Sequence, residues 1–248
     1  TRIFPERREE RLDPVVVEAP LALELDGSAW TVTMRTPGQD LDLALGMLFS
    51  EGLITKPQQV TRLVHCPDAD PPESLVRIQR AAGLDPPAKR AMLTTSACGV
   101  CGLEQIDDLA IRFPAVRRGE AIEEAVLMRA TSALKPLQKV FQLTGALHGA
   151  ALLDAGGKVL YSAEDVGRHN AVDKVIGAAL RQGGLDQPRL ILAVSSRVGF
   201  EIASKAWAAG VQALVAVGAP SDLALRTCQR AGIRLAGFAT GDRLNLYC

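Results

Sequence analysis

The chain has 248 residues, of which 48% are hydrophobic and 23% charged, the balance of an ordinary globular protein. Its 28 Lys and Arg residues are matched by 28 Asp and Glu residues, so no overall basic field points to nucleic acid as a partner. No apolar run approaches the roughly 20 residues of a membrane-spanning helix, and residues 1–13 lack the apolar core of a signal peptide. We therefore expect a cytoplasmic protein with neither a membrane nor a nucleic-acid partner.

The first part of the chain predicts a small α+β unit. Residues 18–34 fit a β-hairpin, because a partly alternating apolar segment turns at Asp26-Gly27, a strong two-residue turn signal. Apolar residues recur at helical spacing between residues 41 and 49, so we expect a helix there with Asp40 as its cap. A further strand is expected at residues 75–79.

The second part of the chain has a more regular pattern. Residues 121–143 are helical in pattern, and residues 150–162 fit a hairpin around Ala155-Gly156-Gly157. A polar loop follows, and then a helix that we expect Asn170 to cap. Buried apolar strands, alternating with helices, come next at residues 190–194, 213–217 and 235–238. Continuous apolar strands of this kind predict a parallel sheet covered by helices on both faces.

The fold class expected from this order of elements is α/β. We divide the chain into a smaller N-terminal α+β part, residues 1–120, and an α/β domain, residues 121–248.

The loops after the expected strands are candidates for a ligand site. Open parallel sheets bind ligands beyond the carboxyl ends of their strands. Here those ends lead into polar or glycine-containing loops at residues 163–169, 195–197, 218–222 and 238–243. Three of these loops carry an arginine, and arginines together with backbone N–H groups at helix N-termini match the geometry of phosphate. This edge is a candidate phosphate or nucleotide site, although strand-end loops are also commonly polar without a ligand.

The loop Ser96-Ala97-Cys98-Gly99-Val100-Cys101-Gly102 carries two of the five cysteines. Thiolates in such a loop attack disulfides, bind metal or accept sulfur as a persulfide. A structural zinc site needs four ligands, and the chain has no second CxxC motif and no closely spaced His pair, so we expect no structural metal. The residues alone leave sulfur transfer and dithiol exchange open for Cys98 and Cys101.

Two histidines are further candidates. His148 lies between small residues, where a lone histidine more often has a structural role. His169 lies in a strand-to-helix turn that contains many charged residues. These charges could perturb the pKa of His169, or they could simply pair with one another in a structural salt-bridge network.

Three motifs resemble the FdhD/NarQ family, the formate dehydrogenase accessory sulfurtransferases. They are the cysteine loop, Thr144-Gly145 with His148, and Glu164-Asp165-Val166-Gly167-Arg168-His169-Asn170-Ala171-Val172-Asp173-Lys174. Ser196-Arg197 with Glu201 and Lys205 supports the resemblance, which runs from about residue 18 to residue 247.

The resemblance implies a function. Such proteins take sulfur from a cysteine desulfurase and pass it to the molybdenum cofactor, bis-molybdopterin guanine dinucleotide, which formate dehydrogenase needs. Cys98 matches the family's persulfide carrier and Cys101 its partner cysteine. The cofactor-binding stretch of the family matches Phe238, Ala239, Thr240, Gly241, Asp242 and Arg243. The resemblance also implies a homodimer.

The family's three-layer α/β/α core resembles that of cytidine deaminases. The deaminase signature has a Glu two residues after its His and a Pro-Cys pair further on, whereas His148 is followed by Gly149-Ala150. We therefore do not expect zinc-dependent deamination. Two other functions stay open: a dithiol oxidoreductase, and a chaperone that binds the cofactor without a covalent sulfur step.

Overall fold

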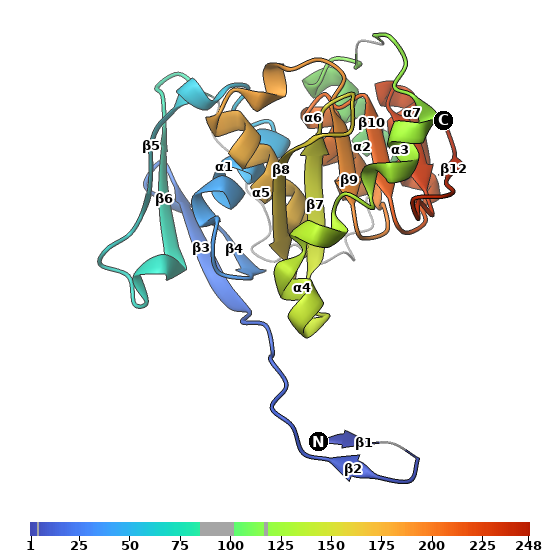
Figure 1. Cartoon of the computed structure of the whole chain (residues 1–248). Coiled ribbons are helices and arrows are strands. Elements are labelled where there is room, and N and C mark those ends of the chain that lie inside the picture. Colours follow the sequence, from blue (N-terminus) through green and yellow to red (C-terminus); the bar gives the residue numbers. More distant parts are fainter. Residues whose placement is uncertain (4, 85–101, 117–118) are drawn as a thin grey trace.

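The computed structural model describes residues 1–3, 5–84, 102–116 and 119–248 (Figure 1). Figure 1 shows a layered body and an N-terminal arm that runs away from it and ends in a small hairpin of β1 (Arg2–Ile3) and β2 (Arg8–Glu9). No helix among these described residues is long and apolar enough to cross a membrane.

The N-terminal part forms a four-stranded sheet in the order β4-β3-β6-β5. Its strands are β3 (Ala19–Leu25), β4 (Ser28–Arg35), β5 (Val60–His65) and β6 (Leu75–Arg80). The predicted hairpin is confirmed: β3 and β4 are antiparallel, and Asp26 and Gly27 have the positive φ angles, 51° and 81°, that such a turn needs. The predicted helix is α1 (Asp40–Ser50), which starts at Asp40 instead of being capped by it, because Asp40 pairs with Arg35.

The second sheet has six strands in the order β12-β11-β10-β9-β7-β8. They are β7 (His148–Leu153), β8 (Val159–Asp165), β9 (Ile191–Val194), β10 (Ala213–Ala216), β11 (Arg234–Gly237) and β12 (Asn245–Leu246). β9, β10 and β11 are parallel, but β7 is antiparallel to both of its neighbours and β12 is antiparallel to β11. The parallel arrangement predicted for the strands at residues 190–238 is therefore confirmed, and so is the hairpin predicted at residues 150–162, which is the antiparallel pair of β7 and β8.

Helices cover both faces of this sheet, so the α/β class is confirmed. One face packs on α3 (Glu124–Ala130), and its buried side chains include Leu153, Ala193 and Val215. The other face, with Leu152, Leu192 and Leu214, packs in the larger apolar cluster that holds the helices α5 (Arg168–Arg181), α6 (Phe200–Ala208) and α7 (Asp222–Ala231). The remaining helices are α2 (Gly102–Arg112) and α4 (Lys139–Thr144), with 3₁₀ turns at Pro57–Gln59, Pro72–Ser74, Lys135–Leu137 and Gly184–Asp186.

The two sheets are joined through a close contact of α1 with α5. A Cβ atom added at Gly46 would overlap the carbonyl oxygen of Asp173, and one added at Gly177 would overlap that of Asp42. The two helix backbones therefore touch at a pair of glycines, one on each helix. The larger apolar cluster accordingly contains side chains of both sheets, such as Leu23 and Leu192. The division into domains at residue 120 stays a prediction.

Candidate functional site

The carboxyl ends of β8, β9, β10 and β11 meet at one edge of the central sheet, as expected. The predicted loops at residues 195–197, 218–222 and 238–243 follow these ends. The loop predicted at residues 163–169 is shorter, because β8 continues to Asp165 and α5 already begins at Arg168. We call residues 163–169 and these three loops the rim. Backbone hydrogen bonds run from loop to loop: the N–H of Gly218 donates to the carbonyl of Ser196 (3.2 Å), and that of Phe238 donates to the carbonyl of Gly218 (3.3 Å). The chain thus builds one continuous edge from segments far apart in sequence.

Residues 238–243 form a compact turn on this rim. Phe238 has a φ of 52°, a left-handed conformation that bulky residues rarely adopt, and its side chain is 44% exposed. The hydroxyl of Thr131 donates to the carbonyl of buried Ala239 (2.9 Å), which fixes the base of the turn. The Thr240 hydroxyl donates to the Asp242 carboxylate (2.6 Å) and thereby lowers the pKa of Asp242. The turn leaves an aromatic side chain and, at its end, Arg243 exposed to solvent.

Basic side chains of the rim are available to an anion. Arg197 and Arg243 are both exposed, and within the part of the chain that the structure describes neither takes part in an ion pair shorter than 4.0 Å. Exposed guanidinium groups, the backbone N–H groups of the loops and the ring of Phe238 are suited to the phosphates and the base of a nucleotide. The residues present are therefore suited to a ligand that carries phosphate groups and an aromatic base.

The charged motif at residues 164–174 separates into two environments. Asp165 and Lys174 are fully buried and form an ion pair of 2.7 Å. Lys174 also donates to the carbonyl of Thr36 (2.8 Å), while the N–H of Thr36 donates to the Asp165 carboxylate (3.1 Å). These two charges hold the N-terminal part against the central sheet, so they have a structural role.

Asn170 belongs to the same structural group. The predicted cap is wrong, since α5 begins two residues earlier, at Arg168. Asn170 is buried in the first turn, and its amide nitrogen donates to the carbonyl of Met34 (2.8 Å) and to Asp165 (3.1 Å).

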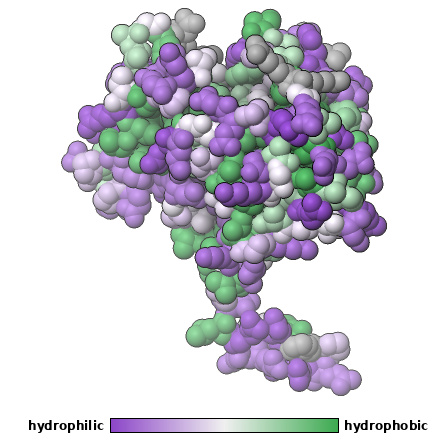
Figure 2. Space-filling view, turned by 45° about the horizontal axis from the view of Figure 1, so that its top comes forward, coloured by the Kyte–Doolittle hydropathy of each residue, from purple (hydrophilic) through white to green (hydrophobic). Residues whose placement is uncertain are grey.

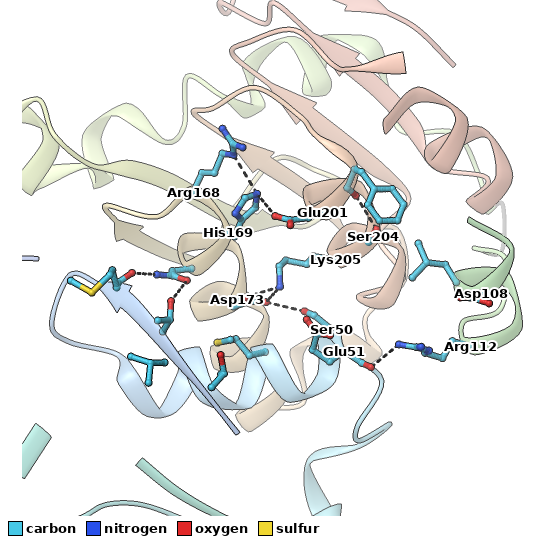
Figure 3. Close-up of a pocket in the computed structure, with 18 residues that line it drawn as sticks. Ser50, Glu51, Asp108, Arg112, Arg168, His169, Asp173, Glu201, Ser204 and Lys205 are labelled. Atoms are coloured by element: carbon cyan, nitrogen blue, oxygen red, sulfur yellow. Dashed lines mark hydrogen bonds and ion pairs between the residues drawn. The ribbon is translucent and has the colours of Figure 1, made fainter. Parts of the chain in front are cut away.

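A cavity of about 580 Å³ opens beside the other half of the motif, between α1, α2, α5, α6 and β4 (Figure 3). Arg168, His169 and Glu201 line one side of it, and Asp108 and Arg112 of α2 line the opposite side. In its wall lies a second buried pair, in which Lys205 Nζ donates to both carboxylate oxygens of Asp173 (2.8 and 2.7 Å).

The His169 ring is held by Glu201. His169 Nε2 lies 2.8 Å from Glu201 Oε2 and 3.3 Å from Arg168 Nε. A single ring nitrogen cannot both donate a hydrogen bond to the Glu201 carboxylate and accept one from the Arg168 guanidinium. We assign the proton to Nε2 because the carboxylate contact is shorter and joins complementary groups. The hydrogen bond from His169 in turn lowers the pKa of Glu201.

His148 lies on the same edge, at the start of β7 and opposite Asp165 of β8. Burial lowers the pKa of His148, and the positive charge of Arg168 lowers it further. Both effects favour the neutral form of this imidazole. His148 and His169, which come from two different predicted motifs, therefore both lie near Arg168.

Several contributors to the cavity were not singled out from the sequence. Ser50, whose hydroxyl donates to Asp173 (2.9 Å), comes from α1, and Asp108 and Arg112 come from α2. Asp108 and Arg112 are four residues apart and so lie on one face of α2, and this spacing was the available signal.

The predicted sulfur site, Cys98 and Cys101, lies outside the described residues. The description resumes with α2, which begins at Gly102, the residue after Cys101 in the sequence. Of the other cysteines, Cys66 and Cys228 are buried free thiols, and Cys248 is partly buried, with its Sγ donating to the carbonyl of Ile233 (3.3 Å). Among the described residues, no group of three or more His, Cys, Asp or Glu side chains is arranged to hold a metal ion.

Fold and rim together define an α/β protein with a candidate nucleotide-binding edge. The fold is similar to that of a crystal structure from Desulfotalea psychrophila, described as a formate dehydrogenase accessory protein. The TM-score is 0.78 at 21% sequence identity, over 99% of this chain and 93% of that one. The family model of the FdhD/NarQ family matches residues 16–248. The chain therefore belongs to the FdhD/NarQ family.

Two curated relatives illustrate the similarity. The sulfur carrier protein FdhD of Anaeromyxobacter dehalogenans is 44% identical over 250 residues, 95% of this chain and 86% of the relative. The sulfur carrier protein FdhD of Nocardia farcinica is 41% identical over 254 residues, 99% of this chain and 90% of the relative.

Proposed function

We propose that this chain is a sulfur carrier, a sulfurtransferase that acts in the activation of formate dehydrogenase. The observation that carries the proposal is the similarity to proteins named sulfur carrier protein FdhD, at 37–44% identity over at least 95% of the chain. The substrate would be persulfide sulfur from a cysteine desulfurase, and the acceptor would be bis-molybdopterin guanine dinucleotide. The protein would act in the cytoplasm, where thiols stay reduced, and as a homodimer.

Cys98 is the proposed sulfur acceptor. Its thiolate attacks the outer sulfur of the desulfurase persulfide, so that a new S–S bond forms at Cys98 while the desulfurase cysteine leaves as a thiolate. No net oxidant or reductant is needed in this step, because one persulfide replaces another. Cys101 is the proposed partner cysteine, which assists transfer or release by thiol exchange.

The rim is the proposed place for the cofactor, which enters as a substrate. Arg197 and Arg243 would hold its phosphates together with backbone N–H groups of the loops. The six residues from Phe238 to Arg243 would hold the guanine nucleotide. Two features support this assignment: Phe238 and Arg243 are exposed, and the turn that presents them is fixed to buried Thr131.

Mass spectrometry of the intact protein tests the carrier step. The chain is incubated with a cysteine desulfurase and cysteine, and wild type is compared with Cys98→Ala and Cys101→Ala. Wild type is expected to gain about 32 Da, a gain that reduction removes and that Cys98→Ala does not show. The Cys101→Ala variant serves as the matched control, since it keeps the proposed acceptor and should still gain sulfur.

Other outcomes point to the alternatives. If wild type gains no sulfur from an active desulfurase, the carrier proposal is wrong. A reversible loss of about 2 Da, from a disulfide between Cys98 and Cys101, with no sulfur gain, would support a dithiol oxidoreductase instead.

A further inference from the structure

The two edges of the four-stranded sheet are protected very differently. Edge strands expose unpaired backbone groups, and proteins commonly shield them with charged side chains. The edge strand β5 carries Arg62 and His65 within its six residues. The opposite edge strand, β4, has eight residues and no charged side chain before its last residue, the buried Arg35. Among the described residues no strand pairs with the outer side of β4, so we consider this edge open to pairing with another strand.

Apolar side chains and free space accompany this open edge. Val32 is 54% exposed and Met34 is 49% exposed, and they lie two residues apart, on one face of β4. Residues Thr31, Val32, Thr33 and Met34 line the cavity of about 580 Å³, so the edge borders this cavity. Asn170 donates to the Met34 carbonyl, so the backbone groups of Met34 point away from β3, and those of Val32, two residues earlier, point the same way.

The N-terminal arm has the complementary properties. Leu12 is 100% exposed, Val15 86% and Val17 63%, and the arm projects from the body just before β3 (Figure 1). Figure 2 shows hydrophobic residues along the arm between the body and the terminal hairpin. Val15-Val16-Val17 is a run of β-branched residues, which favour strands. This segment has strand-forming side chains but pairs with no strand among the residues that the structure describes.

We propose that the arm of a second copy of this chain, centred on Val15-Val16-Val17, adds a strand to the open edge of β4. Backbone hydrogen bonds would form at Val32, and Val15 and Val17 would cover Val32 and Met34. Because each copy has one arm and one open edge, a two-fold axis satisfies both at once in a closed dimer. This exchange specifies the contact in the dimer and does not depend on the sulfur step.

Analytical ultracentrifugation of the full chain tests the exchange. Val32→Lys places a charge on the open edge and Val15→Lys places one on the arm. Each is expected to raise the dimer dissociation constant by about tenfold or more. Thr61→Lys puts the same charge at an exposed position of the other edge strand, β5, and should leave the constant unchanged. A wild type that is monomeric at all concentrations, or a dimer that neither variant weakens, overturns the proposal.

Cross-linking shows whether the contact joins two copies. When Val15→Cys and Val32→Cys chains are mixed and oxidised, a linked peptide pair containing positions 15 and 32 is expected. In such a mixture this pair is necessarily intermolecular, and each variant alone provides the control for the native cysteines. If the pair forms only in the double variant Val15→Cys/Val32→Cys, and within a single chain, the arm folds onto its own body and the exchange is wrong.

Discussion

Polar residues lie in opposite environments in two regions of the molecule. They are buried and paired where α1, α5 and α6 meet, and exposed on the rim of the central sheet. In the helix contact, Asp173 and Lys205 are 2% and 8% exposed and are satisfied by each other and by Ser50. On the rim, Arg197 and Arg243 are exposed and, among the described residues, form no ion pair within 4.0 Å. Charged residues that look equivalent in the sequence therefore belong to two groups in the structure, one with a structural role and one available to a ligand. Changes in the first should alter stability, and changes in the second should alter binding.

The largest effect on stability is expected from Lys205→Met. The change leaves the carboxylate of Asp173 buried without its partner, which costs about 3–5 kcal/mol of unfolding free energy. Urea denaturation at pH 7 measures this loss. The double variant Asp173→Asn/Lys205→Met is the control, and it should recover most of the loss. If Lys205→Met alone is as stable as wild type, the buried pair has no structural role.

The same variant should respond to pH. Burial raises the pKa of Asp173, and the charge of Lys205 opposes this. Without Lys205 the pKa of Asp173 rises further, so the folded state binds a proton that the unfolded chain releases above a pH of about 4. The stability of a protein with such a group falls as pH rises through the folded-state pKa. The deficit of Lys205→Met relative to wild type should therefore shrink between pH 7 and pH 5.

A smaller loss of stability is expected from Gly177→Ala. The added methyl group meets the backbone of α1 at Asp42, and overpacking of this kind costs about 2–3 kcal/mol. Gly199→Ala is the matched control, because nothing lies within 4 Å of a Cβ atom at Gly199 and its φ is −95°. The control should stay within about 1 kcal/mol of wild type in the same denaturation experiment. Equal effects of the two changes would contradict the close contact of the helices.

On the rim, Phe238→Asn should separate binding from stability. Asn adopts the left-handed conformation more readily than Phe, so the free energy of unfolding should stay within about 1 kcal/mol of wild type. Loss of the ring is expected to weaken binding of guanosine diphosphate, a part of the proposed cofactor, by about tenfold in calorimetry. Val217→Asn removes another exposed apolar side chain of the same edge and should leave binding unchanged. Unchanged binding in Phe238→Asn would remove Phe238 from the proposed site.

The smallest effect is a change of one pKa. In His169→Gln the hydrogen bond that lowers the pKa of Glu201 is weakened, so this pKa should rise towards its ordinary value. Because Glu201 has a lowered pKa when folded, the stability that it adds is present above its unfolded pKa and is lost as pH falls through the folded value. Carboxyl NMR titration measures the shift, with Asp242 as the control, since the pKa of Asp242 is lowered by Thr240 and should not move. An unchanged Glu201 would mean that His169 does not donate to it.

Local signals in the sequence were sufficient for much of the fold. The turn at Asp26-Gly27, the turn between β7 and β8, and the alternation of apolar strands with helices are each encoded within a few neighbouring residues. The position of β7 between β8 and β9 was not predictable in this way, because strand order depends on packing between distant segments.

The candidate site was predictable only in part, for the same reason. The rim loops followed from the strand ends, which share one edge of the sheet. Burial of Asp165 and Lys174, however, depends on Thr36, which is 138 residues before Lys174. Ser50 is likewise 123 residues from Asp173. Contacts over such separations leave no local pattern in a single sequence, so structural and available charges could not be distinguished.

The central claim is that sulfur passes through Cys98 to the cofactor, and a labelling experiment tests it most directly. Cysteine carrying ³⁵S is supplied to a cysteine desulfurase together with this chain and a formate dehydrogenase that contains unsulfurated cofactor. With wild type we expect label on the cofactor and formate oxidation; with Cys98→Ala we expect neither. If Cys98→Ala activates the enzyme as well as wild type does, sulfur does not travel through this cysteine, and the chain acts as a cofactor-binding chaperone.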